Sequence, residues 1–114
     1  MLFKRGNVIL VRFPNSDLRT YKKRPALVVQ ADDLETGLNQ RIVAMITSNL
    51  ERSGPTRVKV TKDSSIGREM GLLTDSVIVT DNLATVLGRE VDKVIGHFVA
   101  MEQVDVALRK TLAL

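Results

Sequence analysis

A succession of short, β-branched apolar segments, each followed by polar turn residues, most constrains the fold of this chain. The first segment, residues 7–13, reads Asn-Val-Ile-Leu-Val-Arg-Phe and lies between Gly6 and Pro14. Runs of this kind, bounded by glycine and proline, are typical of buried strands. Further strands are predicted at residues 26–30, 41–46, 56–61, 72–80 and 84–87. In the run 56–61 apolar and polar residues alternate, which indicates a strand with one exposed face.

Polar segments connect these strands. Residues 14–23 are expected to form a long hairpin loop, in which Asn15, Ser16 and Asp17 are turn formers. Residues 31–40 and 62–71 are also polar, and the second segment has room for one helical turn. Loops on a tight scaffold commonly carry function.

The hydrophobic period changes after Gly88. Residues 90–98 are predicted to be a short helix or a turn. Between residues 99 and 112, apolar side chains recur at helical spacing, at Met101, Val104, Leu108 and Leu112. This spacing predicts an amphipathic terminal helix. Five or six short strands and one terminal helix are expected to give a small, strongly curved, barrel-like sheet with the helix packed on it.

Length and composition exclude several classes of protein. The 114 residues predict a single domain over residues 1–114. Cysteine is absent, which excludes disulfides, thiolate catalysis and cysteine-based zinc sites. No carboxylate cluster or histidine pair has the spacing of metal ligands, so neither a metal nor another cofactor is expected. There is no signal-peptide core and no stretch of membrane-spanning length, which predicts a cytoplasmic protein without a membrane partner.

Positive charge is concentrated in the N-terminal part of the chain. The net charge is +4, but residues 1–24 contain seven cations and one acid and so carry +6, which leaves about −2 for the remaining 90 residues. Such polarity favours a phosphate-rich or acidic partner.

A candidate site lies where two predicted strands end. Arg24 and Pro25 lead into the strand 26–30, and the strand 41–46 runs into Thr47 and Ser48. If the strands pair with these ends together, a guanidinium and a hydroxyl face one pocket. That combination binds a phosphodiester and stabilises the charge that develops on it. On these residues alone, a solvated basic loop beside an ordinary strand end explains the pattern too.

Several segments stand in a characteristic order: Gly-Asn-Val-Ile-Leu-Val with Phe-Pro at 6–14, Lys-Arg-Pro-Ala-Leu-Val-Val at 23–29, Ile-Thr-Ser at 46–48, and Gly-Leu-Leu with Asp-Ser-Val-Ile at 71–78. A terminal helix closing in Leu-Ala-Leu follows them. Over nearly the whole chain this order resembles the MazF/PemK toxins of toxin–antitoxin modules. The resemblance implies a dimeric endoribonuclease with an SH3-like, MazF/CcdB-like barrel, which cleaves single-stranded RNA or mRNA without a metal.

The resemblance also implies roles for individual residues. The family's catalytic arginine, in its Arg-Pro motif, corresponds to Arg24, and the catalytic threonine of its Ile-Thr-Ser motif corresponds to Thr47. Ser48, in the same motif, is expected to bind phosphate. Arg24 suits the stabilisation of negative charge and not the role of base, because the pKa of an arginine lies above about 12.

One segment departs from the family pattern. The Gln-Ile-Arg-Thr segment of many members corresponds to residues 82–85, where Ala84 takes the place of the arginine. Some members use an acid and an arginine just upstream instead. Asp81 could match that acid, whereas Val79 occupies the place of that arginine.

The sequence does not identify the residue that acts as general base. A two-histidine relay within one subunit is impossible because His97 is the single histidine, and it is expected near the start of the terminal helix, away from the pocket. Asp17 is an alternative base, but an exposed aspartate is a weak base. It is also suited to capping a turn together with Ser16.

The hairpin loop supplies candidate RNA contacts. Arg19, Lys22 and Lys23 are expected to hold the RNA backbone without regard to sequence. Tyr21 could stack on an unpaired base or anchor the loop on the barrel.

A homodimer is expected, because a second copy would cover the apolar stripe of the terminal helix. A cognate acidic antitoxin is the other expected protein partner. Two alternatives are a non-enzymatic gyrase inhibitor resembling CcdB and an SH3-like binding module. The first class lacks the Arg-Pro and Thr-Ser pocket, and the second needs an aromatic groove that one tyrosine and three phenylalanines hardly provide.

Overall fold

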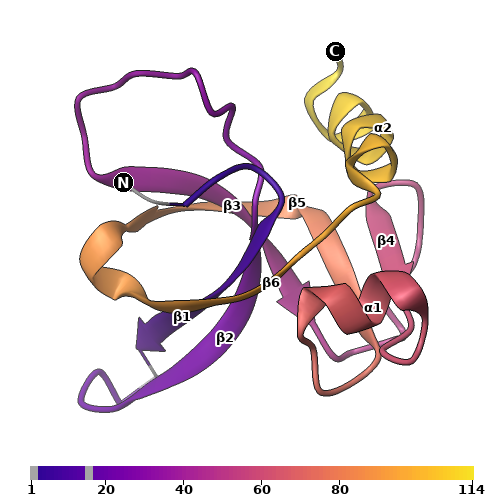
Figure 1. The fold of residues 1–114 in the computed structure, drawn as a ribbon, viewed down its shortest axis with the longest axis horizontal. Helices are drawn as coiled ribbons and strands as arrows, with labels where there is room; N and C mark the ends of the chain where they lie inside the picture. Colours follow the sequence, from indigo (N-terminus) through magenta and orange to yellow (C-terminus); the bar gives the residue numbers. More distant parts are fainter. Residues whose placement is uncertain (1–2, 15–16) are drawn as a thin grey trace.

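The computed structural model describes residues 3–14 and 17–114, which form one six-stranded antiparallel sheet and two α-helices (Figure 1). Asn15 and Ser16, two of the predicted turn formers, lie outside the described residues. The strands are β1 (Asn7–Pro14), β2 (Tyr21–Val28), β3 (Gln40–Thr47), β4 (Arg57–Val60), β5 (Ser76–Leu87) and β6 (Val91–His97). The helices are α1 (Ser65–Met70), the 3-10 turn η1 (Gly88–Glu90) and α2 (Met101–Leu112).

The strands lie in the order β4-β5-β3-β2-β1-β6. The sheet is strongly curved, but within residues 3–14 and 17–114 no ladder joins β4 to β6, so it does not close into a barrel (Figure 1). The helix α2 packs on β4 and β5, and α1 packs against β6. The predicted curved sheet with a terminal helix is therefore confirmed, in an open form.

Two core clusters lie on opposite faces of the central strands. On β2, Leu27 belongs to one cluster, and its neighbours Ala26 and Val28 belong to the other. Successive strand residues point to opposite faces. The uninterrupted apolar run at the end of β2 is explained by burial on both faces. The first cluster also contains Met70 of α1 and Val104 of α2, so it joins the helices to the sheet.

The structure corrects three predictions of secondary structure. The predicted strands 72–80 and 84–87 form one continuous strand, β5, which begins only at Ser76. Residues 91–97 form strand β6 and not a helix or turn, because they pair with β1 along its edge. Pairing of β1 with β2 extends to Pro14 opposite Tyr21, so residues 21–23 belong to a strand and the hairpin loop is shorter than predicted.

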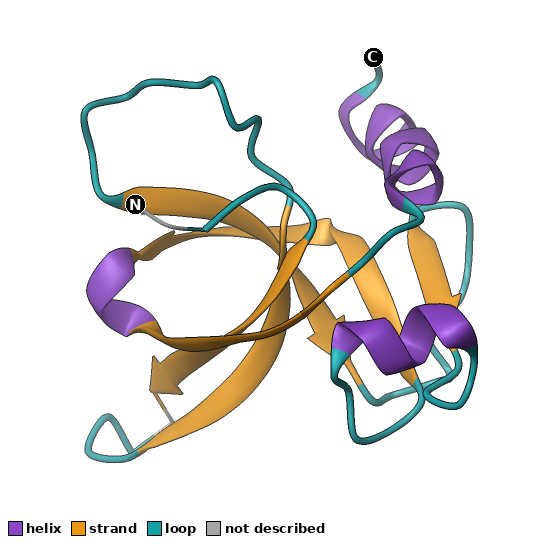
Figure 2. Cartoon of the chain, in the orientation of Figure 1, coloured by secondary structure: helices purple, strands orange, loops and turns teal. Residues whose placement is uncertain are grey.

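The long connection between β2 and β3 and the helical turn after β4 agree with prediction (Figure 2). The helix α1 begins after Ser64, whose Oγ accepts a hydrogen bond of 3.0 Å from the Gly67 N–H. It ends at Gly71, which has a left-handed φ of 71°. This end directs residues 71–74 toward the ends of β2 and β3.

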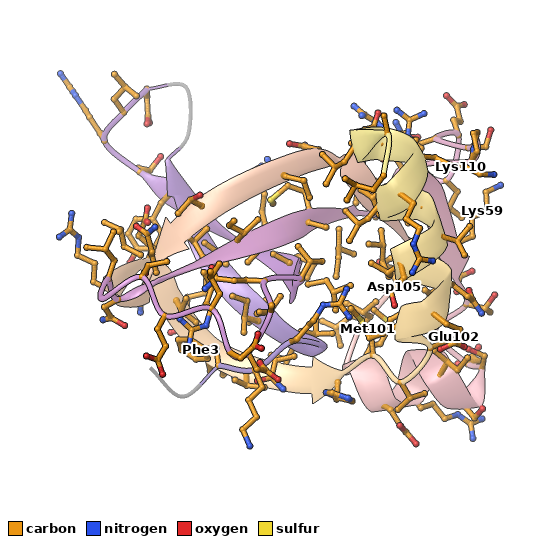
Figure 3. The ribbon with its side chains drawn as sticks, turned by 90° about the horizontal axis from the view of Figure 1, so that it is seen from above. Phe3, Lys59, Met101, Glu102, Asp105 and Lys110 are labelled. Carbon is orange, nitrogen blue, oxygen red and sulfur yellow. The ribbon has the colours of Figure 1, made fainter. Side chains whose placement is uncertain are left out.

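The terminal helix is tied to the N-terminal segment. Arg5 Nη2 lies 2.6 Å from Asp105 Oδ1 of α2, and Arg5 Nε donates to the Val29 carbonyl at 2.9 Å (Figure 3 labels Asp105). One arginine thus connects α2 to the end of β2. Of the helices in the described part of the chain, none is long and apolar enough to cross a membrane.

Candidate active site

The ends of β2 and β3 meet as the candidate site requires. Ala26 of β2 is opposite Met45 of β3. The ladder ends there, and Arg24 and Thr47 lie two residues beyond it on their strands. Both residues line one cleft of about 500 Å³, together with Ser48. The structure therefore brings the predicted guanidinium and hydroxyls into a single pocket.

Five parts of the chain line this cleft. Besides the ends of β2 and β3, they are β1, β6 and the segment that runs from the end of α1 into the start of β5. Its apolar side is formed by Leu10, Pro25, Ile46, Leu72, Leu73 and Ile95. Its polar side is formed by Lys23, Arg24, Thr47, Ser48, Thr74, Ser76 and Lys93. Among the described lining residues there are three cations and no acid, which suits an anionic ligand with an apolar part.

Lys93, Thr74 and Ser76 were not identified from the sequence. Lys93 lies on β6, a segment whose irregular pattern indicated a helix or turn. Thr74 lies in the connection that follows the end of α1 at Gly71, and Ser76 is the first residue of β5. Ser76 stands in the Asp-Ser-Val-Ile segment that resembles the toxin family, but no local signal marks Lys93 or Thr74, because both join the cleft through long-range packing.

The Thr47 hydroxyl already has one partner. Its Oγ1 accepts a hydrogen bond of 3.1 Å from the Asn49 N–H. A hydroxyl has one proton to donate in addition to its acceptor positions. The contact with Asn49 therefore fixes the Thr47 side chain and leaves its O–H able to donate to a ligand in the cleft.

Lys23 is held by Asp92, an acid on β6. Its Nζ lies 3.1 Å from Asp92 Oδ2, and Arg12 Nη2 lies 3.0 Å from the other carboxylate oxygen. The hydrogen bond from Lys23 is the main cause that lowers the pKa of Asp92, and the positive charges of Lys23, Arg12 and Lys93 lower it further. An anion that binds Lys23 must therefore compete with an ionised carboxylate.

Asp17 closes the turn of the hairpin. Its Oδ1 accepts hydrogen bonds from the backbone N–H groups of Arg19 at 2.9 Å and Thr20 at 3.0 Å. The backbone hydrogen bond from Thr20 is the largest of the causes that lower the pKa of Asp17. A carboxylate with a lowered pKa is a still weaker base. Ser16, its expected capping partner, lies outside the described residues.

The other hairpin candidates lie beyond the cleft. Arg19, Tyr21 and Lys22 are exposed, and none of them is among its lining residues. Tyr21, 58% exposed, starts β2 opposite Pro14. These side chains are available to a long ligand that continues past the cleft.

Two further candidates have structural roles. Asp81 Oδ2 lies 3.0 Å from Arg57 Nη2, in an ion pair between β5 and β4. His97 ends β6 and packs against Gly6: a Cβ added at Gly6 would lie 2.7 Å from the imidazole. Neither residue lines the cleft. Ala84 packs against the core cluster that contains Ile9 and Val43.

Among the described residues, no three His, Cys, Asp or Glu side chains come together as a metal-binding group.

The fold and the cleft define a small curved-sheet protein with a terminal helix and a basic, hydroxyl-bearing site. A family model for the PemK-like, MazF-like toxins of type II toxin–antitoxin systems matches residues 4–112. The chain belongs to this toxin family.

Solved structures with the same fold include MazF-mt6 of Mycobacterium tuberculosis, with 24% identity, a TM-score of 0.73 and coverage of 95% of this chain and 97% of that one. An endoribonuclease in complex with its cognate antitoxin, from a mycobacterial species, is 23% identical, with a TM-score of 0.72 and coverage of 98% and 96%. A MazE–MazF structure from Deinococcus radiodurans is 17% identical, with a TM-score of 0.73 and coverage of 100% and 99%. A search of curated protein sequences gives no match.

Proposed function

We propose that this toxin is an endoribonuclease that cleaves single-stranded RNA in the cleft at the ends of β2 and β3. The observation that carries the proposal is the position of Arg24 and Thr47, which line one cleft that has three cations and no acid among its described lining residues. Membership of the PemK/MazF-like toxin family supports it. One protein with the same fold is itself described as an endoribonuclease.

The proposed reaction is internal transphosphorylation. The ribose 2′-oxygen attacks the adjacent phosphorus and loses its proton, the bond from phosphorus to the 5′-oxygen breaks, and that oxygen leaves with a proton. Arg24 donates to the phosphate oxygens, where negative charge builds up, and can do so through two parallel hydrogen bonds. Thr47 donates to the same oxygens or to the leaving oxygen. Asp17 and His97 lie outside the cleft, so neither is assigned the role of base.

The remaining candidates are proposed to bind RNA without taking part in the chemistry. Ser48 and Lys23 contact the reacting phosphodiester and its neighbourhood from within the cleft. Arg19, Tyr21 and Lys22 extend the contact surface along the hairpin, with Tyr21 stacking on an unpaired base. An RNA substrate implies action in the cytoplasm.

Cleavage should proceed in EDTA and leave a 2′,3′-cyclic phosphate (or the 3′-phosphate formed by its hydrolysis) and a 5′-hydroxyl. The reason is that charge stabilisation is assigned to Arg24 and that no metal-binding group of acids or histidine is present in the described residues. Labelled oligoribonucleotides and end-group analysis measure this. Products with a 5′-phosphate, or complete loss of cleavage in EDTA, would exclude this mechanism. A well-folded protein that cleaves no RNA would favour the non-enzymatic, CcdB-like class.

We also propose a homodimer and an acidic antitoxin as protein partners. Most of the predicted apolar stripe of α2 packs within the subunit, because Val104 is fully buried and Met101 and Leu108 pack against the same core cluster. The apolar side chains left exposed on the helix and at its ends are Val99, Val106, Leu112 and Leu114. A second copy would cover part of this surface and bring two basic N-terminal segments together. The basic cleft suits an acidic antitoxin segment that folds as it binds.

The antitoxin and RNA should exclude one another. Both are expected to occupy the basic cleft and the basic surface beside it. Raised salt should also weaken RNA binding steeply, because phosphate contacts release counterions. Competition between the antitoxin's acidic segment and an RNA made non-cleavable by 2′-deoxy substitution tests this. Full-affinity binding of both to one dimer would contradict a shared groove, and a strict monomer at micromolar concentration by sedimentation would contradict the dimer.

A further inference from the structure

A second, smaller recess adjoins the cleft. Its volume is about 140 Å³, and it is lined by Arg24, Met45, Ile46, Thr47, Arg52, Val79 and Asn82. Three of these residues, Arg24, Ile46 and Thr47, also line the larger cleft. Arg24 and Thr47 therefore lie between the cleft and the recess. A ligand bound by these two residues has a hollow on each side.

A bulge in β5 contributes Asn82 to the recess. Met45 of β3 is opposite Val79, but the preceding residue, Ala44, is opposite Leu83. Residues 80–82 are thus extra on β5. A bulge bends its strand and redirects its side chains. The acid in this bulge, Asp81, is paired with Arg57 at 3.0 Å, so its charge is compensated.

A hydrogen-bonded turn contributes Arg52. Asn49 donates its N–H to Thr47 Oγ1 at 3.1 Å, and its own Oδ1 accepts from the Glu51 N–H at 3.1 Å. The Arg52 N–H then donates to the Asn49 carbonyl at 3.3 Å. Two hydrogen bonds through Asn49 therefore connect the Thr47 hydroxyl to the backbone N–H of Arg52, and a third joins Glu51 to Asn49 in the same turn. This turn fixes where the Arg52 side chain starts relative to the proposed site.

The recess has the charge and size of a site for an anionic group. Its described lining residues include two arginines, a threonine and an asparagine, and no acid. Arg52 is exposed and forms no ion pair with the described residues. Pockets for whole small molecules begin at about 300 Å³. The larger cleft exceeds this size at about 500 Å³, whereas the recess suits a phosphate group and not a nucleoside.

We infer that Arg52, assisted by Asn82, binds the phosphate next to the one that is cleaved, an inference that rests on the proposed RNA cleavage. An RNA strand whose reacting phosphate lies on Arg24 and Thr47 presents a nucleoside to the larger cleft and an adjacent phosphate to the recess. Arginine binds such a non-reacting phosphodiester through paired hydrogen bonds. Arg52 then fixes the register of the strand on Arg24 and Thr47 and is a binding residue outside the bond-making step.

The test compares Arg52→Ala with Arg109→Ala on one oligoribonucleotide whose cleavage position has been mapped. Arg109 is exposed on α2 and lines neither hollow, so its variant controls for the loss of one positive charge. Two further substrates carry a neutral methylphosphonate in place of the phosphate on the 5′ side or on the 3′ side of the cleaved one. The substitution Arg52→Ala keeps the backbone N–H that donates to the Asn49 carbonyl, so the turn is expected to fold.

We expect Arg52→Ala to lower kcat/KM about ten- to a hundredfold on the unmodified RNA, the scale of a lost hydrogen bond to a charged group. On one of the two methylphosphonate substrates, the wild-type protein and Arg52→Ala should have the same kcat/KM. On the unmodified RNA, Arg52→Lys should recover part of the activity that Arg52→Ala loses. The affinity for the 2′-deoxy RNA should also depend less on salt, with a slope lower by about 0.7.

Two outcomes would overturn the assignment of Arg52 while leaving RNA cleavage intact. One is that Arg52→Ala loses no more kcat/KM than Arg109→Ala, while the wild-type protein cleaves normally. The other is that Arg52→Ala loses as much kcat/KM on both methylphosphonate substrates as on the unmodified RNA. A wild-type protein that cleaves none of the three RNAs would instead refute the proposed function itself.

Discussion

An Arg24→Ala variant should fold normally and cleave RNA about 10²–10³ times more slowly than the wild-type protein, the usual effect of removing a preorganised group that stabilises developing charge. Arg24 is an exposed residue of β2, opposite Val11 on β1, and its side chain has no ion-pair partner among the described residues. Its removal therefore leaves no buried group unpaired. Initial rates on a labelled oligoribonucleotide, with circular dichroism of the variant, measure the effect.

Lys22→Ala is the comparison variant, because Lys22 is proposed to contact RNA along the hairpin and not at the reacting phosphate. Lys22 lies two residues from Arg24 on the same strand, hence on the same face, but it does not line the cleft. Both substitutions remove one positive charge, so they weaken the long-range attraction of RNA equally. Lys22→Ala should slow cleavage only a few-fold. Equal rates of Arg24→Ala and the wild type would show that the reaction occurs elsewhere on the molecule.

Arg24→Lys and Thr47 variants separate charge from geometry. Lysine keeps the positive charge but loses the planar pair of donors, so Arg24→Lys should recover only part of the rate. Thr47→Ala should lower the rate less than Arg24→Ala, because it removes a neutral donor. Thr47→Ser keeps the hydroxyl and with it the contact to the Asn49 N–H, and should be close to wild type.

Segments with a strong local pattern were predicted well. The β-branched run that became β1, the alternating run that became β4, and the helical spacing that became α2 all lie within a few residues of their predicted positions. In each of these segments, the intrinsic preference of the residues and the pattern of their burial favour the same secondary structure. The apolar residues of α2 that were used for the prediction include Val104, which is fully buried against the sheet.

The errors arose where long-range pairing overrides the local signal. Asp81 and Asn82 are turn formers in sequence, but they lie in the bulge of β5, because β3 continues to pair on both sides of them. The strand β6 has two register shifts against β1 and exposes Val94 at its edge. Its alternation is therefore too irregular to indicate a strand.

The site was predictable to the extent that its residues follow strand ends. Arg24 and Thr47 meet because antiparallel β2 and β3 bring those ends together. Lys93 reaches the cleft through β6, and its neighbour Asp92 holds Lys23. These contacts join residues about seventy positions apart, so neither could be found before the pairing of β6 with β1 was known.

A Gly71→Ala variant should lose about 3–4 kcal/mol of unfolding free energy, because two costs combine at this position. Gly71 has a left-handed φ of 71°, which an L-residue adopts only at a cost. In addition, a Cβ there would lie 2.1 Å from the Ile95 carbonyl oxygen, a backbone atom of β6 that cannot rotate away. Chemical unfolding at a fixed protein concentration measures the loss.

Gly37→Ala measures the cost of the left-handed φ alone. Gly37 has a similar φ of 75°, but nothing lies within 4 Å of its added Cβ. Its variant should lose only about 1–2 kcal/mol. Equal losses for the two variants would mean that the close approach of Gly71 to Ile95 does not constrain the fold. A larger loss for Gly71→Ala should be accompanied by slower RNA cleavage in the folded variant, because Gly71 and Ile95 both line the cleft. The same contact would then hold the end of α1 against β6 at the wall of the cleft.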